Sequence, residues 1–132
     1  MTERSYAWIE LFLGSEKGEK VGQLISDVDE VRTPDIVLAE ISRKYSREKV
    51  DERRVKSRLE TISSTSIVTP VNTHVALKAA TAYLELVEKS KYEKRRSPSL
   101  FDAVVLATAR EYNSKVVTGD EHFESVSEAI MI

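Results

Sequence analysis

The chain has 132 residues, a formal charge of −2 at neutral pH and no cysteine. This charge excludes a uniformly basic nucleic-acid binder, and the lack of cysteine excludes disulfides, thiol nucleophiles and cysteine-ligated zinc. No apolar run reaches membrane-spanning length, and no signal-peptide pattern opens the chain. We therefore expect one cytoplasmic globular domain over residues 1–132, with no membrane partner.

Predicted helices alternate with short apolar strands along the chain. The helices cover residues 5–14, 15–27, 35–45, 51–62, 72–89 and 98–112, and the strands cover residues 31–33, 66–71 and 115–118, with a final apolar segment at 129–132. Either Ser97 or Ser99 can cap the last helix, since both fit the preferences of a helix start. The alternation predicts an α/β fold with a mainly parallel sheet.

Two helices carry apolar sets that we expect to be buried. In the first, Trp8 and Phe12 are assigned to the core or to a dimer contact. In the helix over residues 72–89, the predicted buried set includes Leu77 and Leu84 together with Val75.

Three acidic residues lie where an isolated charge is costly. Asp102 is in the first turn of a helix that is apolar on nearly every side, and Glu40 shares a helix face with Ile36. Asp120 directly follows a buried-type strand, at the end where open α/β sheets bind ligands. We expect these carboxylates to meet at one edge of the sheet.

Carboxylates that meet at one edge repel one another unless a cation or shared protons neutralise them. An oxygen-only ligand set without cysteine favours Mg²⁺ or Mn²⁺ over zinc, and such an ion can support hydrolysis of a phosphodiester. The two histidines, His74 and His122, lack metal-ligand spacing. A phosphate-binding glycine loop and a serine nucleophile elbow are also missing from the sequence.

Four segments, in order, resemble the PIN domain family, and most closely the toxin ribonucleases of VapBC-type toxin–antitoxin pairs. They read SYAWIELFLGSEKG, PDIVLAEI, LFDAVVLATA and VVTGDEHF, at residues 5–18, 34–41, 100–109 and 116–123. The resemblance implies a three-layer domain with a parallel sheet in the order 3-2-1-4-5. It also implies a Mg²⁺- or Mn²⁺-dependent endoribonuclease that acts as a homodimer and is held inactive by the basic tail of a small antitoxin.

Residue by residue, Glu40, Asp102 and Asp120 match three family acids, with the metal-binding and catalytic roles that this implies. Thr118 matches the hydroxyl residue beside the last acid. The first acid does not match, because Arg4 takes its position and the strand before it is short or missing. Glu3 is one residue away, and a one-residue shift along a strand points the side chain to the opposite face. The alternative is thus an impaired PIN-fold module that binds antitoxin or RNA without cleaving.

Each site residue also has an ordinary structural interpretation. Asp102 can stabilise the start of its helix, and Asp120 can be a turn residue or cap the next short helix. Glu40 can pair with a nearby Lys or Arg, and Thr118 can be an ordinary strand residue. The basic segment at residues 89–96 is either a solvated loop or a contact for RNA phosphates.

Overall fold

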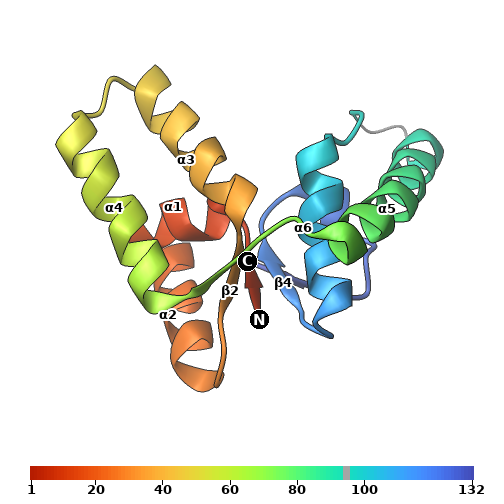
Figure 1. Ribbon diagram of the computed structural model, residues 1–132, viewed down its shortest axis with the longest axis horizontal. Helices are drawn as coiled ribbons and strands as arrows, with labels where there is room; N and C mark the ends of the chain where they lie inside the picture. Colours follow the sequence, from red (N-terminus) through yellow and green to blue (C-terminus); the bar gives the residue numbers. More distant parts are fainter. Residues whose placement is uncertain (94–95) are drawn as a thin grey trace.

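A five-stranded parallel sheet forms the centre of the computed structural model, which describes residues 1–93 and 96–132 (Figure 1). The strand order is β3-β2-β1-β4-β5, as the family resemblance implies. The strands are β1 (Thr2–Glu3), β2 (Arg32–Pro34), β3 (Ile67–Thr69), β4 (Val116–Thr118) and β5 (Ala129–Met131). Lys94 and Arg95, in the basic segment at 89–96, lie outside the described residues.

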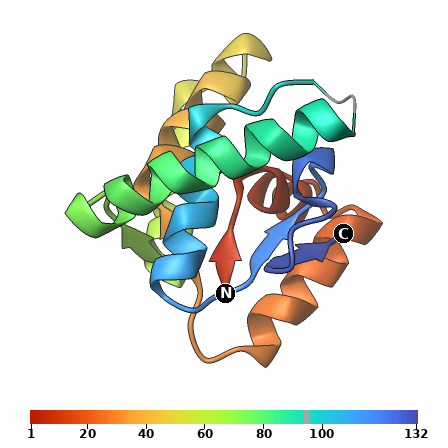
Figure 2. The same cartoon turned by 90° about the vertical axis from the view of Figure 1, so that its right-hand side faces the viewer.

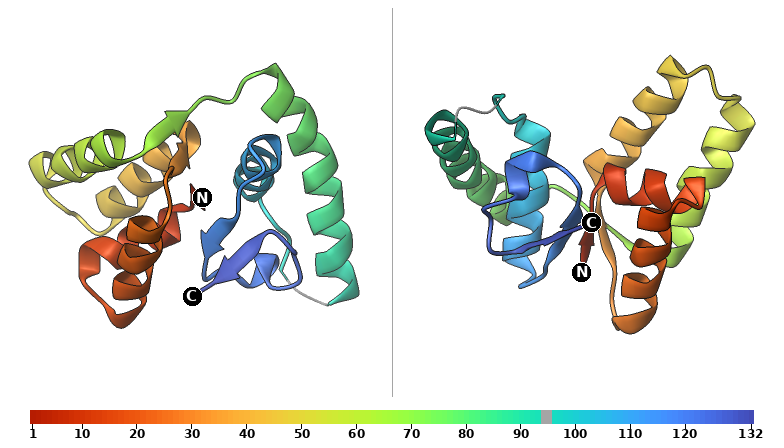
Figure 3. Two further views of the ribbon diagram at one scale, coloured as in Figure 1. Left: turned by 90° about the horizontal axis from the view of Figure 1, so that it is seen from below. Right: turned by 180° about the vertical axis from the view of Figure 1, so that it is seen from behind.

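Helices cover both sides of the sheet. They are α1 (Ser5–Leu13), α2 (Glu16–Asp27), α3 (Asp35–Arg47), α4 (Glu52–Thr65), α5 (Thr73–Tyr92) and α6 (Leu100–Glu111), and a short 3₁₀ helix, η1, spans Glu121–Phe123. Figures 1 and 3 show α5 and α6 on the opposite side of the strands from α1 and α2, and Figure 2 shows α5 crossing over α6. In the described part of the chain, no helix is long and apolar enough to cross a membrane.

The start of α6 is held by a reciprocal cap at Ser99, one of the two predicted candidates. The Ser99 hydroxyl accepts a hydrogen bond from the Asp102 N–H at 3.1 Å, and the Asp102 carboxylate accepts one from the Ser99 N–H at 2.8 Å. This capping box pairs two backbone donors that would otherwise lack partners. It also fixes the Asp102 side chain at the entrance of the helix.

The prediction for the buried face of α5 was partly wrong. Leu77 and Leu84 are 67% and 69% exposed. The covered stripe consists of small and aliphatic residues at helical spacing: Val75, Ala79, Ala82, Leu86 and Ser90. Apolar residues occur on both sides of this helix, so the sequence pattern alone did not identify the side that packs. The helix also continues to Tyr92, beyond the predicted end at residue 89.

Strand β1 is only two residues long, and the charged residue at its end, Glu3, points into the apolar layer under α1 and α2. Glu3 lies opposite Val117 in the pairing of β1 with β4, and Val117 packs with Ala7 of α1 and Val21 of α2. Glu3 is fully buried, and neither of its carboxylate oxygens has a hydrogen-bond partner among the described residues. Burial in this apolar layer raises the pKa of Glu3 to about 8, so the side chain is protonated at neutral pH.

Glu3 makes the stability of the fold fall as the pH rises. Between the ordinary pKa of 4.5 and the folded value of about 8, Glu3 ionises in the unfolded chain but stays neutral in the fold. Integrated over this window, the loss of folding free energy is on the order of 5 kcal/mol. We expect Glu3→Gln to remove this part of the pH dependence, as measured by urea unfolding at pH 4, 7 and 9. An equal pH slope in both proteins would show that Glu3 ionises normally in the fold.

Candidate functional site

The candidate site lies at the carboxyl edge of the central strands. Arg4 directly follows β1, Asp120 follows Gly119 at the end of β4, and Asp102 is in the first turn of α6. Glu40 extends from α3 beside them. The fold thus brings Asp102 and Asp120 together around Arg4, whereas Glu40 lies outside this contact group and hydrogen-bonds to Ser5.

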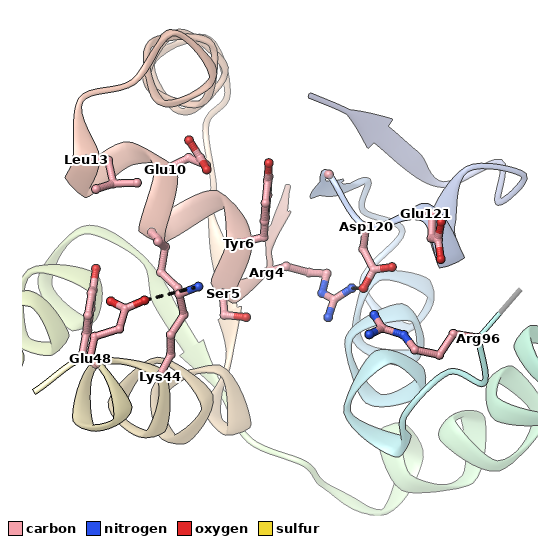
Figure 4. Close-up of a pocket in the computed structure, with 13 residues that line it drawn as sticks. Arg4, Ser5, Tyr6, Glu10, Leu13, Lys44, Glu48, Arg96, Asp120 and Glu121 are labelled. Atoms are coloured by element: carbon pink, nitrogen blue, oxygen red, sulfur yellow. Dashed lines mark hydrogen bonds and ion pairs between the residues drawn. The ribbon is translucent and has the colours of Figure 1, made fainter.

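Arg4 forms two ion pairs at the centre of the site. Its Nη2 lies 2.7 Å from Asp102 Oδ1, and its Nη1 lies 2.8 Å from Asp120 Oδ2. Arg4 and Asp102 are 6% and 4% exposed, so their charges are almost fully removed from water. The guanidinium also lies over the Phe123 ring, 5.0 Å from its centroid. Figure 4 shows the Arg4 and Asp120 side chains reaching toward each other.

The other contacts of Asp120 come from η1 and β4. Its Oδ1 accepts a hydrogen bond from the His122 N–H at 2.9 Å and contacts the ring Nδ1 of His122 at the same distance. The other ring nitrogen of His122 contacts the backbone carbonyl of Arg96. Thr118 is buried, and its hydroxyl accepts a hydrogen bond from the Asp120 N–H at 3.0 Å. Thr118 therefore sets the turn that presents Asp120.

Glu40 is half-buried, and the Ser5 hydroxyl donates a hydrogen bond to its Oε1 at 3.3 Å. Burial raises the pKa of Glu40, and the negative charge of Asp102 adds to the rise, although Arg4 and Ser5 oppose it. The electrostatic effects of Arg4 and Asp102 connect Glu40 to the same charged cluster.

Asp120 shows the opposite balance. Burial alone would raise its pKa, but the His122 N–H hydrogen bond and the Arg4 guanidinium hold the pKa below its ordinary value. Asp120 is therefore a carboxylate at neutral pH.

An open pocket of about 590 Å³ adjoins these residues. Its lining includes Arg4, Ser5, Lys44, Arg96 and Asp120, and Figure 4 shows the Arg96 side chain pointing toward the place where Arg4 meets Asp120.

Tyr6 forms part of the pocket wall beside Gly119. A Cβ atom at Gly119 would collide with the Tyr6 ring, so a larger residue here would force this ring to move. The sequence pattern alone marks Gly119 only as the residue before Asp120.

The residues present do not fit a divalent metal in this arrangement. Oxygens of Asp102 and Asp120 and a ring nitrogen of His122 lie within 4.8 Å of one another, which is close enough for a shared ion. All four carboxylate oxygens of the two aspartates, however, already have partners: Arg4, Ser99 and His122. The positive charge that pairs with the two aspartates is supplied by the chain itself.

Sequence reasoning missed several contributors to the site. It treated Arg4 only as the residue that stands where the family has an acid, whereas Arg4 forms ion pairs with both aspartates. It did not predict the hydrogen bond from Ser5 to Glu40 or the contact between His122 and Asp120. The proximity of His122 to Asp120 in the segment Gly-Asp-Glu-His was the available signal, because an Asp side chain commonly accepts from the backbone two residues on.

Comparison with known proteins identifies a family. A profile of the PIN domain matches residues 5–129. Among curated protein sequences, none matches this chain significantly.

Solved structures with the same fold include three toxin–antitoxin proteins. The VapC20 toxin of Mycobacterium tuberculosis, described as cleaving the sarcin-ricin loop, is 20% identical, with a TM-score of 0.71 over 96% of this chain and 94% of that one. A toxin–antitoxin complex from Klebsiella pneumoniae is 18% identical, with a TM-score of 0.69 over 98% and 95% of the two chains. VapBC2 from Rickettsia felis, bound to promoter DNA, is 16% identical, with a TM-score of 0.67 over 99% and 96%.

The double ion pair makes Arg4 important for stability. We expect Arg4→Met to lower the free energy of unfolding by about 3 kcal/mol, because it leaves two buried carboxylates without their counter-charge. The loss should shrink at acidic pH, where the orphaned carboxylates take up protons. Urea unfolding at pH 4 and pH 7.5 measures both effects.

The matched control for this substitution is Lys56→Met. Lys56 pairs with Glu60 at 3.9 Å, but both side chains are largely exposed, so its loss should change stability by about 0.5 kcal/mol or less. Equal effects of the two substitutions would show that the Arg4 pairs contribute no more than a surface pair.

Proposed function

We propose that this protein, which belongs to the PIN domain family, is the toxin-type member of a toxin–antitoxin pair and binds RNA without cutting it at a metal centre. The double ion pair of Arg4 is the observation that supports the absence of cutting. A guanidinium bonded to both Asp102 and Asp120 takes the position in which a divalent ion would join the same carboxylates.

Electrostatics gives the size of the effect. A guanidinium about 6 Å from a divalent ion opposes its binding by about 3 kcal/mol per unit of ion charge at an effective dielectric of about 20. Each such increment is on the order of a hundredfold in affinity. Moving Arg4 out instead would break a buried pair, which typically costs about 3–5 kcal/mol. Both routes disfavour Mg²⁺ or Mn²⁺ at this site.

The domain extent, oligomeric state, location and partner that we propose are those implied by the family. We propose a single PIN domain over residues 1–132, a homodimer in the cytoplasm, and a small antitoxin as partner. The structural neighbours described as toxin–antitoxin complexes support the antitoxin. Because Arg4 already pairs with two of the three carboxylates and offsets one of their negative charges, a basic antitoxin tail would gain less binding energy here than at a site of unpaired acids.

A second candidate function is metal-dependent endoribonuclease activity, with Glu40, Asp102 and Asp120 as metal ligands and Thr118 beside them. The open pocket of about 590 Å³ that Arg4 and Asp120 line favours it, because the pocket offers room for the Arg4 side chain. This candidate requires Arg4 to leave both aspartates before an ion enters.

One substitution separates the two candidates. We expect the wild-type protein to show no Mn²⁺ binding in the millimolar range and no Mn²⁺-dependent RNA cleavage. Arg4→Asp should gain both, because it replaces the central positive charge with a fourth carboxylate. Isothermal titration with MnCl₂ and gel analysis of a labelled RNA measure the two outcomes.

The control adds Asp102→Asn to Arg4→Asp, and this double variant should lose the gained binding and cleavage. Two results together would instead establish the ribonuclease candidate. The wild type would bind Mn²⁺ in the millimolar range or more tightly, and it would cleave RNA. Asp102→Asn or Asp120→Asn would abolish this cleavage, whereas Asp27→Asn, at an exposed position of α2, would leave it unchanged.

A further inference from the structure

The α3–α4 region concentrates positive charge in an otherwise acidic chain. Positions 43–58 contain eight basic and three acidic residues, although the whole chain has a formal charge of −2. This group of basic residues is larger than the one at residues 89–96.

One part of this charge is aligned with the candidate site. Arg43, Lys44 and Arg47 follow Glu40 by three, four and seven residues in α3, so all four lie along one side of the helix. Lys44 lines the same pocket as Arg4 and Asp120, and the positive charge of Arg43 acts on Glu40. We call Arg43, Lys44 and Arg47 the α3 basic stripe.

The α3 basic stripe is open to solvent. Arg43 and Arg47 are exposed, and within the described part of the chain neither forms an ion pair. Lys44 pairs with Glu48 only at 3.8 Å, between side chains that are both about half exposed. Such a pair is weak, so all three cations are available to a partner.

The surroundings favour a polyanion over a folded protein as that partner. In the described residues, no large hydrophobic side chain is exposed on α3 or α4. Protein interfaces place apolar and aromatic side chains at their centres and exclude charge there. Arginine is well suited to bidentate contact with phosphate.

We infer that the α3 basic stripe is an RNA-backbone track that leads a single strand to the pocket at Arg4 and Asp120. From Glu40 to Arg47 the helix rises about 10 Å, which is about three nucleotides of a stacked strand. The inference rests on the proposed RNA binding, and it adds which surface provides the phosphate contacts.

The test compares two double variants with the same change in charge. Arg43→Gln with Arg47→Gln removes two cations from the stripe. Lys20→Gln with Lys115→Gln removes two exposed lysines elsewhere, one on α2 and one before β4, at the opposite edge of the sheet. Fluorescence anisotropy of a labelled 20-nucleotide single-stranded RNA gives Kd for each full-length protein over a range of NaCl concentrations.

The stripe variant should bind the RNA roughly 20-fold more weakly at 0.1 M salt, with its log Kd–log salt slope about 1.4 shallower, as expected for two lost single-strand phosphate contacts. The control variant should match the wild type. Unchanged circular dichroism checks that both variants fold.

Equal RNA affinity of the stripe variant and the wild type would overturn the track and leave RNA binding itself intact. No RNA binding by the wild type would overturn both. Tighter binding of a labelled poly-glutamate peptide than of the RNA, lost in the stripe variant, would assign the surface to an acidic protein and overturn the RNA assignment.

Discussion

The buried guanidinium of Arg4 is the interaction on which the candidate site depends. Two aspartates, one in the first turn of α6 and one just after β4, would repel each other at this distance without a cation between them. Because the cation is Arg4, which directly follows strand β1, the counter-charge comes from within the chain. The same ion pairs that join the two halves of the sheet edge also occupy the carboxylates.

The end of the central strand places two opposite charges on opposite faces of the sheet. Glu3 and Arg4 are neighbours that point to opposite faces, so one charge enters the apolar layer under α1 and α2 while the other enters the acidic cluster. If the two residues were exchanged, the glutamate would face the acidic cluster and the arginine would be buried in the apolar layer. The order of these two residues therefore determines both the pH dependence of stability, through Glu3, and the charge of the site, through Arg4.

Much of this architecture could be predicted from the sequence. Strand and helix alternation gave the parallel sheet, and the apolar surroundings of Asp102 and Glu40 indicated convergence at one edge. The exposed side of α5 could not be predicted, because Leu77 and Leu84 are as apolar as the residues that pack against α6. The role of Arg4 was also missed: its partners lie 98 and 116 residues away, and only the fold brings them together.

Diffraction from crystals grown in millimolar MnCl₂, recorded at the manganese absorption edge, tests the central claim most directly. The account predicts no anomalous peak between Asp102 and Asp120, with the Arg4 guanidinium still bonded to both. A manganese peak between the two carboxylates, with Arg4 turned away into the pocket, would contradict it.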